Sequence, residues 1–122
     1  AYMAASGVPD RYENTCDETV KFARQVLRRL EDFNKRNNLN INVRIGINNG
    51  RVVAGVIGKT KFIYDLWGEP VNLAWRLQTN GIANRIHVSG RVKSILDGKY
   101  DFEERGSLDM KGFGSVKTFL LK

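Results

Sequence analysis

Residues 15–36 carry the longest regular hydrophobic pattern in the chain. Apolar residues recur there every three to four positions, which is the spacing of one buried stripe on an α-helix. The stripe consists of Val20, Ala23, Val26, Leu27, Leu30 and Phe33. Thr15 and Glu18 have the spacing of a capping box, and Lys35 and Arg36 suit the negative end of a helix dipole. The pattern therefore predicts a helix over residues 15–36.

The pattern then changes to a period of two, which indicates strands. Ile41, Val43, Ile45 and Ile47 alternate with polar residues or glycine, as in a strand with one buried face. Asn49-Gly50 is a strong hairpin signal, so the segment RVVAGVIG is predicted to return as a second strand. A third strand, KFIYDLW, is predicted to end before Gly68.

The second half of the chain mixes helices and strands. Pro70 suits a first helical turn, so we expect a short helix over residues 70–79 that is ended by Gly81. The segment RIHVS predicts a strand, Ser89 can cap the helix GRVKSILD, and glycine turns join the strands of the tail. With no repeat and no linker, the order of elements favours one α+β domain built as a split βαβ sandwich.

Composition narrows the class of protein without choosing a function. The 122 residues suffice for one domain with a modest core, and 42% apolar with 27% charged residues is ordinary globular composition. The net charge of +7 suits an anionic partner such as a nucleotide, nucleic acid or acidic lipid. Cys16 is the only cysteine, which excludes an intramolecular disulfide and favours a reducing compartment.

Membrane contact is not expected from this segment. No run approaches the roughly 18 apolar residues of a membrane span. The first residues, AYMAASGVPD, lack the basic segment and long apolar core of a signal peptide. We therefore expect a cytoplasmic domain, whose parent protein can still be attached to a membrane.

Three polar residues interrupt the apolar stretch YDLWGEPVNLAWRLQTNG. Asp65 lies near the end of a predicted strand, and Asn72 and Arg76 are four apart on the following helix, so the last two share a face. Strand end and helix start thus converge on one spot, where Arg76 offers a planar set of donors suited to phosphate. The alternative is structural, with Asp65 capping a turn, Asn72 satisfying the first helical turn and Arg76 facing water.

The sequence resembles one known family. The segments AYMAASGVP, RIGINNGRVVAGVIG, FIYDLWGEPVNLAWRL and DMKGFG, in this order and spacing, look like the class III nucleotidyl cyclase catalytic domain of adenylyl and guanylyl cyclases. The resemblance covers essentially the whole chain. It implies a ferredoxin-like αβ sandwich that dimerises with its sites at the interface. It also implies conversion of a nucleoside triphosphate to a 3′,5′-cyclic monophosphate and pyrophosphate by attack of the substrate's own 3′-hydroxyl on the α-phosphate.

The resemblance also implies roles for single residues. Asp65 falls at the purine-selecting position, which is Asp in adenylyl cyclases and typically Cys in guanylyl cyclases, and the backbone of Leu66 belongs to the same contact. Asn72 falls at the position that orients the ribose, and Arg76 at the one that stabilises charge on the α-phosphate. The two positions that hold the triphosphate are Arg44 and Lys111. The substrate implied by Asp65 is ATP, and the enzyme is an adenylyl cyclase acting as a homodimer.

The family's two Mg²⁺ (or Mn²⁺) ions need a pair of carboxylates that this chain does not match. One belongs to a motif like F-x-D-I-x-x-F-T, and the other immediately precedes the segment matching AYMA. We therefore assign no metal ligand here and expect the ligands upstream of Ala1, so that residues 1–122 are the C-terminal two-thirds of the catalytic domain. The chain alone is expected to be inactive. Phe113 replaces the second basic residue of the family's K-G-K-G loop, which leaves Lys111 alone.

Other distinctive residues are interpreted as structural. Trp75 stands where the family has a small residue, and we interpret it as a core residue, with reshaping of the purine end as the alternative. His87 is interpreted as a residue on a strand face and Cys16 as an ordinary helix residue. The carboxylates of Asp10, Asp17 and Asp32 are assigned to a turn, a first helical turn and a solvated face.

Three other functions stay open at this point. The first is a guanylyl cyclase, and the second is a catalytically silent cyclase homologue that acts as a dimer partner. The presence of both Asn72 and Arg76 argues against the second. The third is an RNA-binding module, because the RNA-recognition motif shares the ferredoxin-like fold. No aromatic segment of that motif occurs in the chain, so we expect no nucleic-acid partner.

Overall fold

The computed structural model describes residues 2–7, 13–51, 53–57 and 63–122. Its elements follow the chain in the order α1 (Thr15–Asn37), β1 (Ile45–Ile47), β2 (Val53–Ile57), β3 (Ile63–Trp67), α2 (Glu69–Thr79), β4 (Ile86–Ser89), α3 (Gly90–Ile95), β5 (Phe102–Met110) and β6 (Gly114–Leu121). The predicted helices over 15–36 and 70–79 are confirmed. Ser89 caps α3 as predicted, because its Oγ accepts a hydrogen bond from the N–H of Val92 at 3.3 Å.

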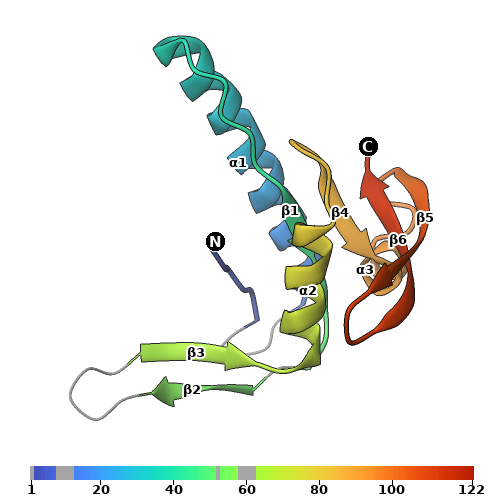
Figure 1. The fold of residues 1–122 in the computed structure, drawn as a ribbon. Coiled ribbons are helices and arrows are strands. Elements are labelled where there is room, and N and C mark those ends of the chain that lie inside the picture. The colour runs from blue at the N-terminus through green and yellow to red at the C-terminus, as the bar shows by residue number, and fades with distance from the viewer. Residues whose placement is uncertain (1, 8–12, 52, 58–62) are drawn as a thin grey trace.

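The strands form two separate sheets (Figure 1). The larger has the order β1-β4-β6-β5, with β1 parallel to β4 and the other neighbours antiparallel. β2 and β3 pair antiparallel with each other and extend away from the main sheet below α2 (Figure 1). We refer to this two-stranded unit, residues 53–57 and 63–67, as the arm.

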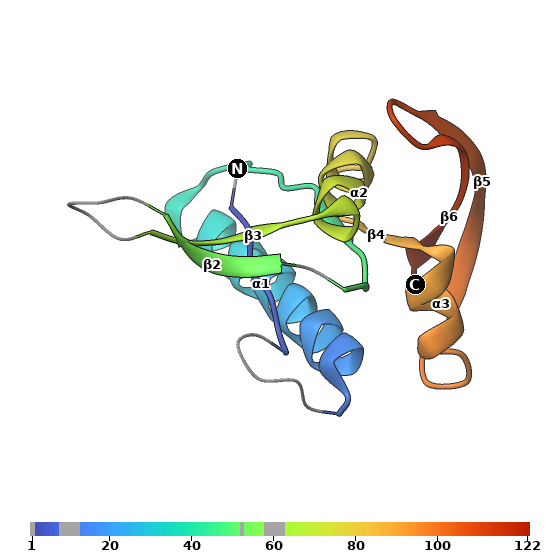
Figure 2. The same ribbon diagram turned by 90° about the horizontal axis from the view of Figure 1, so that it is seen from below.

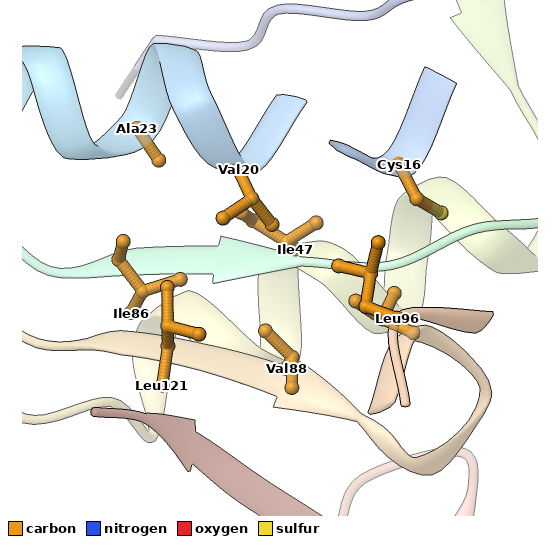
Figure 3. Packing of buried hydrophobic residues seen from close by; sticks show 9 residues of the cluster. Cys16, Val20, Ala23, Ile47, Ile86, Val88, Leu96 and Leu121 are labelled. Atoms are coloured by element: carbon orange, nitrogen blue, oxygen red, sulfur yellow. The ribbon is translucent and has the colours of Figure 1, made fainter. Parts of the chain in front are cut away.

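Helices cover both faces of the main sheet. Cys16, Val20 and Ala23 of α1 point toward strand residues such as Ile47 and Val88 (Figure 3). Buried residues of α3 join the same cluster. α2 lies on the opposite face (Figure 2). The outer half of α1 extends past the strands, and its stripe is incompletely covered there, since Phe33 is 44% exposed.

Close contact between α2 and β1 depends on a glycine. A Cβ on Gly46 would lie 2.4 Å from the N of Gln78 and 2.5 Å from the O of Ala74, both backbone atoms of α2. Backbone atoms of a helix cannot move aside as a flexible side chain can. Gly46 thus lets the helix lie directly on the sheet.

Two predictions for residues 41–50 were wrong. Residues 41–44 are not a strand, because asparagine side chains take the place of a neighbouring strand as hydrogen-bond partners. The side-chain amide of Asn34 donates to the carbonyl of Ile41 and accepts from its N–H. The side-chain oxygen of Asn84 accepts from the N–H of Val43. The sequence Asn49-Gly50 does not close a hairpin, since β1 and β2 belong to different sheets.

Steric contact explains the glycine at position 50. A Cβ on Gly50 would lie 2.4 Å from Cγ of Pro70, so a larger residue does not fit where the chain passes over the start of α2.

The predicted capping box at Thr15 is also absent. Asn14 is the N-cap, with φ of 62° and no side-chain capping bond, and Thr15 is already helical.

Within the described part of the chain, α1 is the longest helix, and neither it nor the others combine the length and apolar character that a membrane span requires.

Gly46→Ala should destabilise the chain by roughly 1–3 kcal/mol, the usual cost of forcing extra volume into a packed region. Gly90→Ala is the matched control, because its added Cβ would meet only ordinary contacts at 3.7 Å and 3.9 Å. Urea unfolding followed by circular dichroism measures both. Equal unfolding free energies for the two variants would contradict the close contact of α2 with β1.

Candidate functional site

The arm leads into α2 through a single glycine. Gly68 has φ of 129°, a conformation that favours glycine, and its carbonyl accepts a hydrogen bond from the N–H of Asn72 at 3.2 Å. Asp65 lies three residues before this turn and pairs with Gly55 across the arm. The backbones of Asp65 and Leu66 therefore lie close in sequence to the first turn of α2, while their side chains lie outside what the structure describes.

One face of α2 is turned to solvent. Asn72, Trp75, Arg76 and Thr79 follow the i, i+3, i+4, i+7 spacing of one helix face. Asn72 and Thr79 are exposed, Arg76 is half-buried, and Leu77 on the opposite face is fully buried. Asn72 and Arg76 thus share one face, as their spacing predicts. The interpretation of Trp75 as a core residue was wrong, because its side chain is 52% exposed on this same face.

The two other predicted cations lie on different elements. Arg44 immediately precedes β1, is exposed, and donates from Nη1 to the carbonyl of Thr79 at 3.1 Å, so it lies at the same end of α2 as Arg76. Lys111 lies in the turn between β5 and β6 and is also exposed. Among the described residues, no hydrogen bond or ion pair joins Lys111 to α2.

Two side chains at the end of α2 were not predicted to act there. Arg105 of β5 donates from Nη1 to the carbonyl of Asn80, and His87 of β4 bonds through Nδ1 to the carbonyl of Leu77 at 2.8 Å. Neither contact has a signal in the local sequence, because each joins segments that are distant along the chain. The nearest signal is the Arg105-Gly106 pair, since a glycine within a strand often marks a β-bulge.

Burial controls the electrostatics of His87. The side chain is fully buried on the α2 face of β4, which confirms its interpretation as a strand-face residue. Because a carbonyl only accepts, Nδ1 carries the proton, and Nε2 has no partner among the described residues. Burial lowers the pKa of His87, the bond to Leu77 opposes that shift, and the positive charge of Arg105 adds to it.

Cys16 and Asp17 have structural surroundings. Burial raises the pKa of the Cys16 thiol, so the residue is an ordinary buried residue of α1. The Asp17 carboxylate accepts from the hydroxyl of Tyr100 at 2.5 Å and lies within 3.5 Å of Lys99 Nζ. The Tyr100 hydrogen bond is the main cause of the lowered pKa of Asp17.

Possible metal ligands do not cluster among the described residues. Asp32 is exposed on α1, and Asp10 lies outside the described residues. Within the described ranges, no three His, Cys, Asp or Glu side chains come together in a way that could hold a metal ion. The described residues therefore do not make up a metal site by themselves.

Two hollows lie away from the predicted site residues. One of about 130 Å³ lies where the N-terminal segment, α1 and the start of α2 meet, and its walls include Ser6, Cys16 and Pro70. The other, of about 550 Å³, lies beside α3 and is lined by Lys93 and residues 97–102. Asn72, Arg76, Arg44 and Lys111 line neither of these two hollows; Arg44, Asn72 and Lys111 are exposed, and Arg76 is half-buried.

Comparison with known proteins identifies the family. The family model described as the adenylate and guanylate cyclase catalytic domain matches residues 1–122. The chain therefore belongs to the adenylate and guanylate cyclase catalytic domain family, and it has the mixed α+β fold of class III cyclase catalytic domains.

Relatives of both substrate types occur. The chain is 43% identical to adenylate cyclase type 9 of Gallus gallus, with 98% of the chain and 10% of the relative covered. It is 35% identical to the receptor-type guanylate cyclase gcy-28 of Caenorhabditis elegans, with 100% of the chain and 10% of the relative covered. The chain thus spans about a tenth of the length of these relatives.

Among solved structures, the guanylate cyclase domain of RhGC from Catenaria anguillulae, determined in complex with GTP, superposes with a TM-score of 0.89 at 30% identity. The alignment covers 95% of this chain and 64% of that domain.

The unfolding free energy should fall as the pH falls below about 6.5, the ordinary pKa of histidine. His87 is the only histidine, and its pKa is lowered in the folded state, so the unfolded chain takes up the proton first. The loss should reach up to about 1.4 kcal/mol per pH unit. Urea unfolding between pH 7 and 5 measures it. His87→Gln keeps a donor for Leu77 and should flatten the slope, whereas equal slopes would contradict this origin.

Proposed function

We propose that this chain is part of an adenylyl cyclase catalytic domain, which converts ATP to 3′,5′-cyclic AMP and pyrophosphate. The observation that carries the proposal is the outward face of α2, where Asn72 and Arg76 stand together directly after the strand that holds Asp65. A nucleotide lying along this face can meet base-, ribose- and phosphate-binding groups in that order. The family relationship supports the reaction class.

Arg76 has the most direct chemical role. Its guanidinium is planar and permanently charged, and it meets negative charge as it grows on the α-phosphate during attack by the 3′-hydroxyl. Asn72, one helical turn earlier, orients the ribose so that this hydroxyl faces the phosphorus atom. Fixing both groups on one helix reduces the entropy cost of aligning them, which is a main contribution of the protein in phosphoryl transfer.

Arg44 and Lys111 hold the triphosphate in this proposal. Arg44 uses one of its N–H groups on the carbonyl of Thr79, which leaves further donors of its guanidinium for phosphate oxygens. Lys111 contributes a compact charge from the exposed turn between β5 and β6. Both would neutralise the pyrophosphate as it leaves.

The base is read by the arm. A carboxylate at Asp65 accepts a hydrogen bond from the exocyclic amine of adenine, whereas guanine presents a carbonyl oxygen at that position. The backbone of Leu66 completes the contact. Relatives of both kinds occur, so adenylate cyclase type 9 supports ATP and the receptor-type guanylate cyclase supports GTP as the second candidate.

The site is proposed to be completed by a second copy of the domain. Asn72, Arg44 and Lys111 are exposed, and the described residues gather no group of three or more possible metal ligands. We therefore assign the metal carboxylates to the region preceding the segment AYMA, contributed by the partner in a two-fold homodimer. Residues 1–122 would then be the C-terminal two-thirds of the domain.

Arg76→Ala in the complete catalytic domain should lower kcat by roughly 10²- to 10³-fold with a much smaller change in KM, because its contact strengthens only as charge develops. Arg29→Ala, which removes an exposed arginine of α1, is the matched control. Steady-state kinetics with ATP measures both variants. An unchanged kcat for Arg76→Ala would return this residue to a structural role.

Asp65→Cys should weaken ATP use and relax the preference for ATP over GTP without producing an efficient guanylyl cyclase. A site that hydrogen-bonds a substrate group rejects an analogue lacking it, by up to about 10⁴-fold where the site is closed to water. The measurement is kcat/KM for both nucleotides in the parent and in Asp65→Cys. A parent that prefers GTP, or a ratio that does not change, would refute base reading by Asp65.

A further inference from the structure

Three side chains from three separate segments of the chain bond to carbonyls at the C-terminal end of α2. His87 of β4 bonds to the carbonyl of Leu77, Arg44 before β1 donates to that of Thr79, and Arg105 of β5 donates to that of Asn80. The last carbonyls of a helix lack partners within the helix and carry partial negative charge, so two arginines there are favourable. The end of α2 is thus fastened to the main sheet by side chains as well as by packing.

A β-bulge directs Arg105 toward this end. Glu104 pairs with Phe119 and Gly106 pairs with Thr118, so Arg105 is an extra residue without an opposite partner on β6. Gly106 has φ of 96°, which favours glycine. A bulge of this kind changes the direction of a side chain and is treated as a specified feature of a strand.

Asn80 connects Arg105 to Arg76. The backbone N–H and the side-chain amide of Asn80 both donate to the carbonyl of Arg76, each at 2.9 Å, and the carbonyl of Asn80 accepts from Arg105. The backbone of Arg76 is therefore linked through one residue to a strand of the main sheet.

We propose that Arg105, acting through Asn80, is a positioning residue that sets where the Arg76 guanidinium stands. In its effect on turnover, this proposal rests on the proposed function of Arg76. The last turn of a helix frays readily, and a displacement of about 1 Å in a catalytic group can cost roughly 10²-fold in rate. Arg105 restrains that turn without touching the substrate.

The first experiment does not depend on activity. Amide hydrogen exchange of the complete catalytic domain is compared for Arg105→Met, which removes the donors, and for Arg85→Met. Arg85 is the matched control, because it pairs with Glu103 at 3.1 Å, and among the described residues no hydrogen bond joins its side chain to α2. Arg105→Met should speed exchange roughly tenfold at residues 77–81, as expected for a lost charge-assisted hydrogen bond, and leave α1 unchanged. Unchanged exchange at residues 77–81 would overturn the proposal.

The second experiment uses the complete catalytic domain and a double-mutant cycle. Arg105→Met should lower kcat by about 10- to 10²-fold with little change in KM, and Arg105→Lys should recover part of the loss. In the Arg76→Ala background Arg105→Met should have almost no further effect on kcat, because its role acts through Arg76. An equal loss with and without Arg76 would show a general structural role and overturn the proposal.

The two experiments can separate a failure of this proposal from a failure of the proposed function. If Arg105→Met does not fold, Arg105→Lys carries both measurements, with the same direction and a smaller change expected. If Arg76→Ala itself leaves kcat unchanged, the proposed function fails, while the exchange result still decides whether Arg105 restrains the end of α2.

Discussion

The contact of α2 with β1 at Gly46 is the constraint on which the candidate site depends. Absence of a side chain there lets the backbone of α2 lie directly on the sheet, and Leu77 and His87 fill the space beside it. This contact decides which face of the helix is buried. The opposite face, with Asn72 and Arg76, is consequently turned toward solvent.

Electrostatics at the carbonyl end of α2 shape the same site. Arg44, Arg76 and Arg105 all lie at this end of the helix, and Arg44 and Arg105 donate to the carbonyls of Thr79 and Asn80. The partial negative charge of the helix end offsets part of the repulsion between the cations. If the chain acts as proposed, a triphosphate would bring anionic charge to these cations, which suits the net charge of +7.

Hydrophobic periodicity was enough to predict the elements with a strong local pattern. α1, α2 and α3 appear near their predicted places, because each combines an apolar face with recognisable start or end residues. Asn49-Gly50 misled the prediction, since a glycine required by the passage over Pro70 looks the same in sequence as a glycine required by a turn.

The candidate site was predictable to a different extent. The shared face of Asn72 and Arg76 follows from a spacing of four residues. Exposure of Trp75 did not follow from its apolar character, because a sequence does not tell whether an apolar side chain faces the core or an outer surface. The contact of Arg105 with Asn80 joins residues 25 positions apart and depends on a bulge, so no local pattern could reveal it.

Gly68 has a consequence for how such domains diversify. It is the junction between the arm, which carries Asp65, and α2, which carries Asn72 and Arg76. If these residues act as proposed, the choice of base and the chemistry at phosphorus belong to two structural units joined at one glycine. Substitutions in the arm can then change the nucleotide that is used, while the residues of α2 that act on the ribose and phosphate stay the same. A single ancestral scaffold could supply both cyclic nucleotide signals by that route.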